Sequence, residues 1–284
     1  MLLRMIISNV RSELNKINFK VDDIYVEKIT DNRSFLNASK GEEKFFIEYY
    51  NEGCFSVLER YKEFTKYGIK MVEILAFTDK IIIRPDMSDN STYRRIEKHD
   101  FMGENVVFSV AKLYKSLADI QDINLYDYNN LFNKNNLKFV MNYYKWNSDK
   151  TMGYIYDNFD NIKLKLDRLQ KGVILKKLDL NNLVVSKENN EVYLFNFMDL
   201  ERCYCYKSVR EILGYIDDKY RDDFIKQIGD FTYTDELVDY IVTSVIELYL
   251  YASNKNSYGN IGDYIESVSN GRLLESCKSL VEWY

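Results

Sequence analysis

Apolar and polar side chains follow two different periods along the N-terminal part of the chain. Runs in which apolar or aromatic residues alternate with polar ones are separated by short polar turns, and they predict an antiparallel sheet. The predicted strands are residues 23–29, 35–39, 44–50, 72–75 and 80–84. Apolar residues three or four positions apart predict amphipathic helices before and after the first three strands. These helices are residues 1–18 and 53–67, and the second ends before Gly68, a residue that favours helix termination.

The pattern after residue 95 is mostly helical. Residues 104–120 place Val107, Val110 and Leu117 on one face, which predicts a buried helix. Residues 124–136 are rich in Asn and Tyr and predict a loop or an insertion. The other helical stretches are residues 136–144, 151–170, 217–228, 235–252 and 259–284.

One stretch, residues 173–200, departs from this helical pattern and predicts a β-hairpin. A polar and then apolar run at 181–185 and a β-branched and aromatic run at 192–197 are joined by a charged, Asn-rich turn. Acidic or amide residues stand at the open end of the hairpin: Asp179, Asn182, Asn196 and Asp199. Such a group can bind a cation or a phosphate, but Asp and Asn also occur at these positions simply because they cap and turn the chain.

Composition excludes several classes of function. The net charge of −5 and the pI of about 5.3 argue against broad nucleic-acid binding, which needs a basic face. The single histidine, His99, lies in a charged stretch, so hydrolase triads and His-rich metal centres are set aside. No run of 18 apolar residues predicts a membrane span, and the first ten residues do not resemble a secretory signal. The four cysteines lack framework spacing, and we expect reduced thiols in a cytoplasmic protein.

The order of these parts resembles the aminoglycoside phosphotransferase and choline kinase family, including its spore-coat relatives. The resemblance is carried by Asn182-Leu-Val-Val185 in the first hairpin strand and by Leu194-Phe-Asn-Phe197 in the second. It implies an α+β, two-lobed protein-kinase-like fold. Residues 1–86 would form a small antiparallel-sheet N-lobe with one main helix, and residues 87–284 a larger, mostly helical C-lobe that contains the hairpin.

The resemblance also implies ATP and Mg²⁺ as cofactors and assigns family positions to residues of this chain. In the family, an Asp orients the attacking hydroxyl, and an Asn five residues later and an Asp in the next strand hold magnesium. Asp179 stands only three residues before Asn182, so it is a displaced candidate for the base. Asn196 replaces the metal-binding Asp, and Asp199 could join it only if the strand end turns back.

The nucleotide-lobe positions are altered as well. Glu48 stands where the family has the strand lysine that pairs with phosphates, and Glu59 matches the helix glutamate that normally pairs with that lysine. A carboxylate at position 48 would repel phosphate. The Glu48–Glu59 combination cannot form the family's ion pair, and Glu59 can equally be a solvent-facing helix residue.

Three hypotheses follow. The favoured one is a catalytically impaired pseudokinase that acts as a binding or regulatory module, because the strand lysine, the metal Asp and the regular base position are all substituted. The alternative is an active ATP-dependent small-molecule (hydroxyl) phosphotransferase that uses Asp179, Asn182 and Asp199 in rearranged roles. A third keeps the body as a scaffold without nucleotide. The sequence leaves open whether the partner is a small molecule or a protein.

Overall fold

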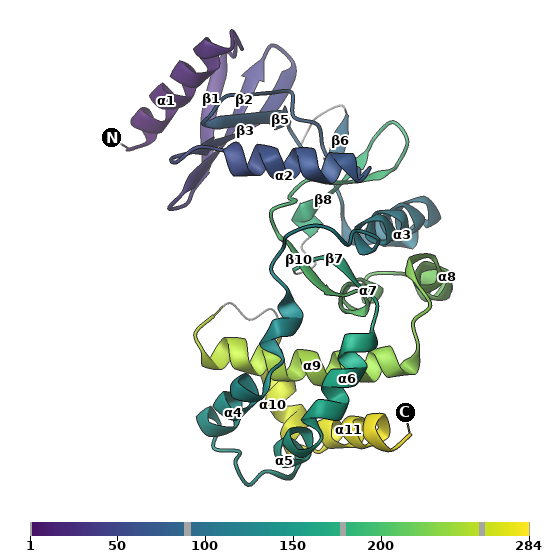
Figure 1. Cartoon of the computed structure of the whole chain (residues 1–284). Coiled ribbons are helices and arrows are strands. Elements are labelled where there is room, and N and C mark those ends of the chain that lie inside the picture. Colours follow the sequence, from purple (N-terminus) through teal and green to yellow (C-terminus); the bar gives the residue numbers. More distant parts are fainter. Residues whose placement is uncertain (1, 88–91, 177–179, 256–258, 284) are drawn as a thin grey trace. The chain divides into compact units, whose positions relative to one another are not determined.

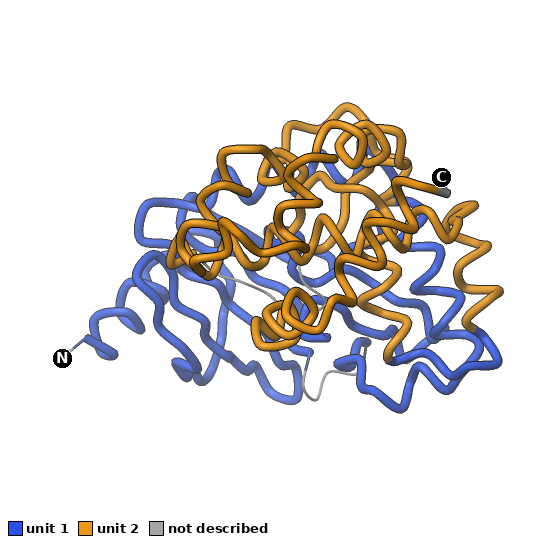
Figure 2. The backbone as a smooth tube through the Cα atoms, turned by 90° about the horizontal axis from the view of Figure 1, so that it is seen from below, with its two compact units in different colours: residues 1–116, 179–199, 215–220 blue, residues 117–178, 200–214, 221–284 orange. Residues whose placement is uncertain are grey.

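A computed structural model describes residues 2–87, 92–176, 180–255 and 259–283. The fold is mixed α+β, as predicted, and the chain divides into two compact units (Figure 2). Unit 1 comprises residues 1–116, 179–199 and 215–220, and unit 2 comprises residues 117–178, 200–214 and 221–284. In the described part of the chain, no helix is long and apolar enough to cross a membrane.

Unit 1 contains a five-stranded antiparallel sheet with the strand order β1-β2-β3-β5-β4 (Figure 1). Its strands are β1 (Asp23–Ile29), β2 (Arg33–Lys40), β3 (Glu43–Tyr50), β4 (Ala76–Phe77) and β5 (Ile81–Pro85). The predicted strand over residues 72–75 is wrong. Val72 instead donates its backbone N–H to the carbonyl of Leu194, and the sheet strand begins only at Ala76.

The two faces of this sheet have different side chains because successive residues of a strand point to opposite faces. One face packs against α1 (Leu2–Lys16), as Figure 1 shows. The core between them is apolar and includes Ile6, Val10, Leu14, Leu36, Ile47, Ile81 and Ile83. The other face carries polar and aromatic side chains, because Phe35 pairs with Glu48 across β2 and β3, and Phe46 pairs with Arg84 across β3 and β5. The helix α2 (Phe55–Lys66) follows β3 as predicted.

The predicted hairpin is confirmed. Strands β8 (Leu183–Ser186) and β9 (Val192–Leu194) pair antiparallel, with Val184 opposite Tyr193. A short strand that the sequence did not predict, β6 (Tyr93–Arg95), completes a three-stranded sheet with the order β6-β8-β9. Strand β9 is shorter than expected, because the backbone N–H groups of Phe195 and Asn196 both donate to the carbonyl of Asn182.

The rest of the chain is mainly helical (Figure 1), and most of it belongs to unit 2. The helices are α3 (Glu104–Ala118), α4 (Lys134–Tyr143), α5 (Lys150–Asp157), α6 (Phe159–Arg168), α7 (Tyr206–Leu213), α8 (Asp218–Ile228), α9 (Tyr233–Ala252), α10 (Ile261–Ser269) and α11 (Arg272–Trp283). The short 3₁₀ turns are η1 (Lys98–Met102), η2 (Tyr128–Leu131) and η3 (Leu180–Asn182). Unit 2 also contains an antiparallel pair that was not predicted, β7 (Lys171–Leu175) with β10 (Leu200–Tyr204).

The core of unit 2 surrounds α9, which is buried along most of its length. Two predicted helices are each divided in the structure. Residues 151–170 form α5 and α6, because Asn158 ends the first helix, and residues 259–284 form α10 and α11, which are separated near Gly271 at a φ of +81°. A left-handed conformation of this kind is typical of a glycine at a helix end.

Candidate ligand-binding pocket

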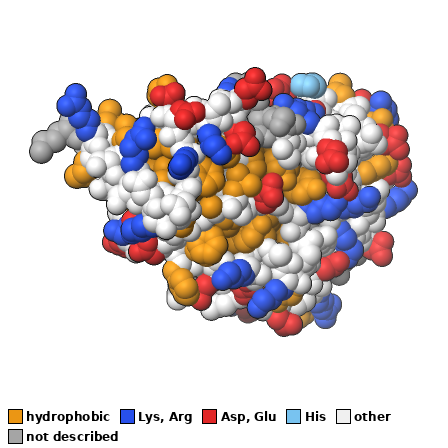
Figure 3. All heavy atoms as spheres, turned by 90° about the horizontal axis from the view of Figure 1, so that it is seen from above, with side chains coloured by type: hydrophobic (Ala, Val, Ile, Leu, Met, Phe, Trp, Pro, Cys, Tyr) orange, Lys and Arg blue, Asp and Glu red, His pale blue; other side chains and the backbone are white. Residues whose placement is uncertain are grey.

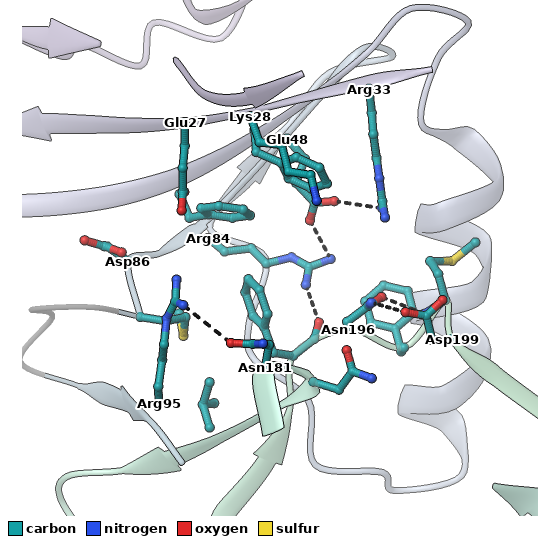
Figure 4. Close-up of a pocket in the computed structure, with 18 of the residues that line it drawn as sticks. Glu27, Lys28, Arg33, Glu48, Arg84, Asp86, Arg95, Asn181, Asn196 and Asp199 are labelled. Carbon is teal, nitrogen blue, oxygen red and sulfur yellow. Dashed lines mark hydrogen bonds and ion pairs between the residues drawn. The ribbon is translucent and has the colours of Figure 1, made fainter. Parts of the chain in front are cut away.

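A pocket of about 430 Å³ lies entirely within unit 1 (Figure 4). Its walls come from the polar and aromatic face of the sheet, from α2 and from the end of the hairpin. The lining includes four phenylalanines, Phe35, Phe46, Phe195 and Phe197. It also includes four basic residues, Lys28, Arg33, Arg84 and Arg95, and four acidic ones, Glu27, Glu48, Asp86 and Asp199. A volume of this size is typical of small-molecule sites.

Glu48 lies at the centre of one wall and is held by three partners. Its side chain is buried, with 7% exposed, and points away from the core that Ile47 and Tyr49 join on the opposite face of β3. The Arg84 guanidinium lies 3.3 Å from one carboxylate oxygen, and that of Arg33 lies 3.6 Å from the other. The Tyr50 hydroxyl donates to the carboxylate at 2.6 Å. Burial, and then the charge of Glu48, raise the pKa of Tyr50 well above its usual range.

Arg84 connects the sheet to the end of the hairpin. Only 3% of this residue is exposed, and its Nη1 donates to the carbonyl of Phe195 at 2.6 Å. Its guanidinium also lies over the rings of Phe195 and Phe197, at 5.3 and 5.0 Å from their centroids. The Nε–H of Arg84 is buried and has no acceptor among the residues that the structure describes. The side chain is therefore fixed in position but retains a donor that the described part of the chain does not satisfy.

The chain turns back after β9, so Asp199 does reach Asn196. The Asn196 side-chain amide donates to Asp199 Oδ2 at 2.6 Å, and Asn196 Oδ1 accepts from the backbone N–H of Met198 at 3.2 Å. Asn182 is buried and lines the same pocket. The structure therefore brings together four of the predicted site residues, Glu48, Asn182, Asn196 and Asp199.

This group does not fit Mg²⁺ well. Proteins usually bind magnesium through one or two carboxylates in near-octahedral geometry, and Asp199 is the one carboxylate among the three predicted metal ligands. One of its oxygens already accepts from Asn196, and the oxygen of Asn196 is engaged by Met198. Across the described ranges, no three His, Cys, Asp or Glu side chains are grouped so that they could hold a metal ion.

The remaining predicted residues lie elsewhere. Glu59 is exposed on α2 and does not line the pocket. Asp179, the candidate base, lies outside the described residues. His99 is exposed, with 73% of its side chain accessible, and is visible on the surface in Figure 3.

Arg33 and Arg84, which together hold Glu48, were not predicted as site residues from the sequence. A signal for Arg84 was present, because it directly follows three apolar residues of a strand, Ile81-Ile82-Ile83-Arg84. A charged residue in a buried strand needs a buried partner of opposite charge. The identity of that partner depends on the pairing of β3 with β5, which sequence periodicity does not give.

The sequence matches no protein-family model and no curated protein. Solved structures nevertheless resemble the chain over nearly its whole length. The choline kinase LicA from Streptococcus pneumoniae superposes with a TM-score of 0.56 at 9% identity, covering 98% of this chain and 100% of that one. LicA in complex with AMP gives a TM-score of 0.50 at 9% identity and covers 95% of this chain and 98% of its own.

A macrolide 2′-phosphotransferase type I is also similar, with a TM-score of 0.56 at 9% identity, covering 93% of this chain and 95% of that enzyme. At identities this low, the similarity shows the fold alone. The chain has the protein-kinase-like fold of the choline kinases and macrolide phosphotransferases, as the resemblance of its motifs implied.

Proposed function

We propose that this chain is a catalytically impaired pseudokinase whose unit 1 pocket binds a nucleoside phosphate without magnesium, and that it acts as a binding or regulatory module. The observation that carries the proposal is the state of Glu48. A buried carboxylate occupies the strand position at which the family resemblance implies a phosphate-binding lysine, and Arg33, Tyr50 and Arg84 hold it there.

The loss of catalysis follows from the chemistry of phosphoryl transfer, which depends almost entirely on positioning and on stabilising charge. A residue that repels phosphate replaces one that attracts it, and an amide replaces one metal-binding carboxylate. The amide of Asn196 is moreover bonded at both of its ends, to Asp199 and Met198. Each change weakens a different requirement of the reaction.

Binding of a nucleoside phosphate is supported by the pocket itself. Its phenylalanines offer flat apolar surfaces for a base, and its arginines offer planar donors that suit phosphate. The similarity to LicA, which has been solved with AMP, supports an adenine nucleotide as the first ligand to test.

The test is thermal unfolding of the purified chain with AMP, ADP or ATP, in EDTA and in Mg²⁺, together with an assay for ATP consumption. A ligand at about 100 times its Kd stabilises by about 2.7 kcal/mol, and a protein of this size then unfolds a few degrees higher. We expect a similar upward shift with and without magnesium and no ATP consumption.

Two other results would contradict the proposal. A shift that needs magnesium, with ATP consumption, would favour the active phosphotransferase and make Asp179→Ala and Asn182→Ala the next variants. No shift at millimolar nucleotide would favour a scaffold without a nucleotide, and protein partners would then be sought.

A further inference from the structure

We infer that Arg33 is the phosphate-binding residue of this pocket, and that the buried Glu48–Arg84 pair, which has no net charge of its own, positions it. This inference rests on the proposed function, because it assigns the part of the pocket that would recognise the phosphate of the ligand.

Arg33 is both accessible and held in place. Its side chain is 32% exposed, whereas Glu48 and Arg84 are almost completely buried. The ring of Phe35 lies 4.8 Å from its guanidinium carbon, and the Glu48 carboxylate lies 3.6 Å from its Nη1. Figure 4 shows dashed lines that join Arg33 to Glu48 and Glu48 to Arg84. An arginine fixed in this way loses less side-chain freedom when it binds an anion.

The charged side chains that line the pocket balance overall, with four basic residues against four acidic ones. Glu48 shares its charge between Arg84 and Arg33, and the guanidinium of Arg33 is both the more distant from the carboxylate and the more exposed of the two. A phosphate group that enters the pocket would therefore meet the charge of Arg33 first.

Arg84 gives an independent sign of a missing acceptor. Among the residues that the structure describes, its buried Nε–H has no acceptor, although the rest of the guanidinium contacts Glu48 and donates to the carbonyl of Phe195. Buried donors in native proteins are nearly always satisfied. The described side chains therefore do not complete the hydrogen bonding of this wall.

The phenylalanines of the pocket favour an anion that also carries a flat apolar group. Phe35 stacks on Phe46 with ring centroids 5.9 Å apart, and Phe195 meets Phe46 edge-on at 5.5 Å. Free phosphate would leave these apolar surfaces in water, whereas a nucleoside phosphate would cover them with its base. The ligand class is therefore a phosphorylated nucleoside.

The experiment compares calorimetric binding of adenosine, AMP and ADP to the full chain in EDTA, for the wild type, Arg33→Gln and Arg33→Lys. The control is Arg11→Gln, which removes the same charge from the exposed surface of α1, outside the pocket. Loss of a charge-assisted hydrogen bond lowers affinity roughly tenfold or more. We expect Arg33→Gln to lose that factor for AMP and ADP but not for adenosine, and Arg33→Lys to lose less.

The outcomes separate this inference from the proposed function. If the wild type binds AMP and Arg33→Gln binds it equally well, Arg33 is not the phosphate-binding residue, although the proposed function stands. If Arg33→Gln weakens adenosine as much as AMP, Arg33 shapes the pocket and the inference is likewise wrong. If the wild type binds none of the three ligands, both the proposed function and the role of Arg33 are wrong.

Discussion

Glu201 and Glu48 are both buried glutamates, but they differ in their partners. Glu48 has two guanidinium groups and a hydroxyl, whereas Glu201 on β10 of unit 2 shares Lys207 with other acceptors. The Lys207 ammonium lies 3.6 Å from Glu201 but 3.2 Å from Glu211, and it donates to the carbonyl of Lys176 at 2.7 Å. Burial therefore outweighs the attraction of Lys207 and raises the pKa of Glu201 to about 7.

This shift predicts a specific dependence of stability on pH. The ordinary pKa of Glu is 4.5, so between about pH 4.5 and 7 the folded state holds a proton that the unfolded state has released. As the pH rises through this window, the contribution of Glu201 to the free energy of unfolding is therefore lost. Above this window Glu201 is ionised in both states, and its contribution no longer changes with pH. We expect Glu201→Gln to match the wild type near pH 5 and to be more stable at pH 8, by up to about 3 kcal/mol.

Urea unfolding of the wild type and of Glu201→Gln at pH 5, 6, 7 and 8 measures the difference in their free energies of unfolding. The titratable and charged groups that face Glu201 are Lys176, Lys207 and Glu211, together with Tyr126, Tyr128 and Cys203. Groups that titrate equally in both proteins cancel in the comparison. Parallel pH profiles for the two proteins would contradict the prediction.

At the scale of elements, Gly172 allows β7 to lie directly against the backbone at the end of α3 within unit 2. A Cβ built on Gly172 would lie 2.3 Å from the carbonyl oxygen of Ala118 and 2.6 Å from its Cα. Backbone atoms cannot move aside as the end of a flexible side chain can. Any other residue at position 172 must therefore displace β7 from the end of α3.

Gly172→Ala should accordingly destabilise the chain by roughly 1–3 kcal/mol, the range for overpacked cores, while the pocket of unit 1 remains able to bind ligand. The matched control is Gly153→Ala in α5, where a Cβ would meet nothing within 4 Å. That change replaces a glycine inside a helix and should be neutral or stabilising by up to about 1 kcal/mol. Thermal unfolding of the two variants checks this, and equal midpoints would refute the close-approach argument.

The elements that the sequence predicted well are those whose stability is local. Strands β1, β2 and β3 have strong β-type patterns and clear turns, and the structure places them within a few residues of the prediction. Strands β6, β7 and β10 were missed because each is short and is stabilised by pairing with a partner distant in sequence. Residues 72–75 were wrongly predicted because Val72 packs with Met87, Tyr93 and Val184 rather than in the sheet core, and only Leu75 donates a backbone hydrogen bond to β5, at the carbonyl of Ile83.

The same distinction between contacts that are local in sequence and contacts that are distant applies to the candidate site. The hairpin motif identified Asn182, Asn196 and Asp199 as neighbours, because they are close in sequence, and the structure places them around one pocket. The partners of Glu48 come from β2 and β5, which are set by strand register. The carboxylate of Glu48 in a predicted strand was therefore visible in the sequence, whereas the guanidinium groups that pair with it were not.

At the scale of the whole molecule, each unit has its own hydrophobic core, and the chain passes between the units several times. The core of unit 1 lies between α1 and the sheet, and that of unit 2 surrounds α9. Units with separate cores can open locally with different free energies, and a ligand raises only the free energy of openings that disrupt its site.

Saturating ADP should therefore slow amide hydrogen exchange in β3 and β5, which form the pocket wall, and leave exchange in α9 of unit 2 unchanged. Mass spectrometry of peptides covering residues 43–50, 81–85 and 233–252 measures this, and Arg33→Gln at the same ADP concentration should show weaker protection of the pocket wall. Equal slowing in α9 would mean that both units open together in one cooperative step. Binding would then stabilise the chain as a whole, and a regulatory role would have to act through global unfolding rather than through unit 1 alone.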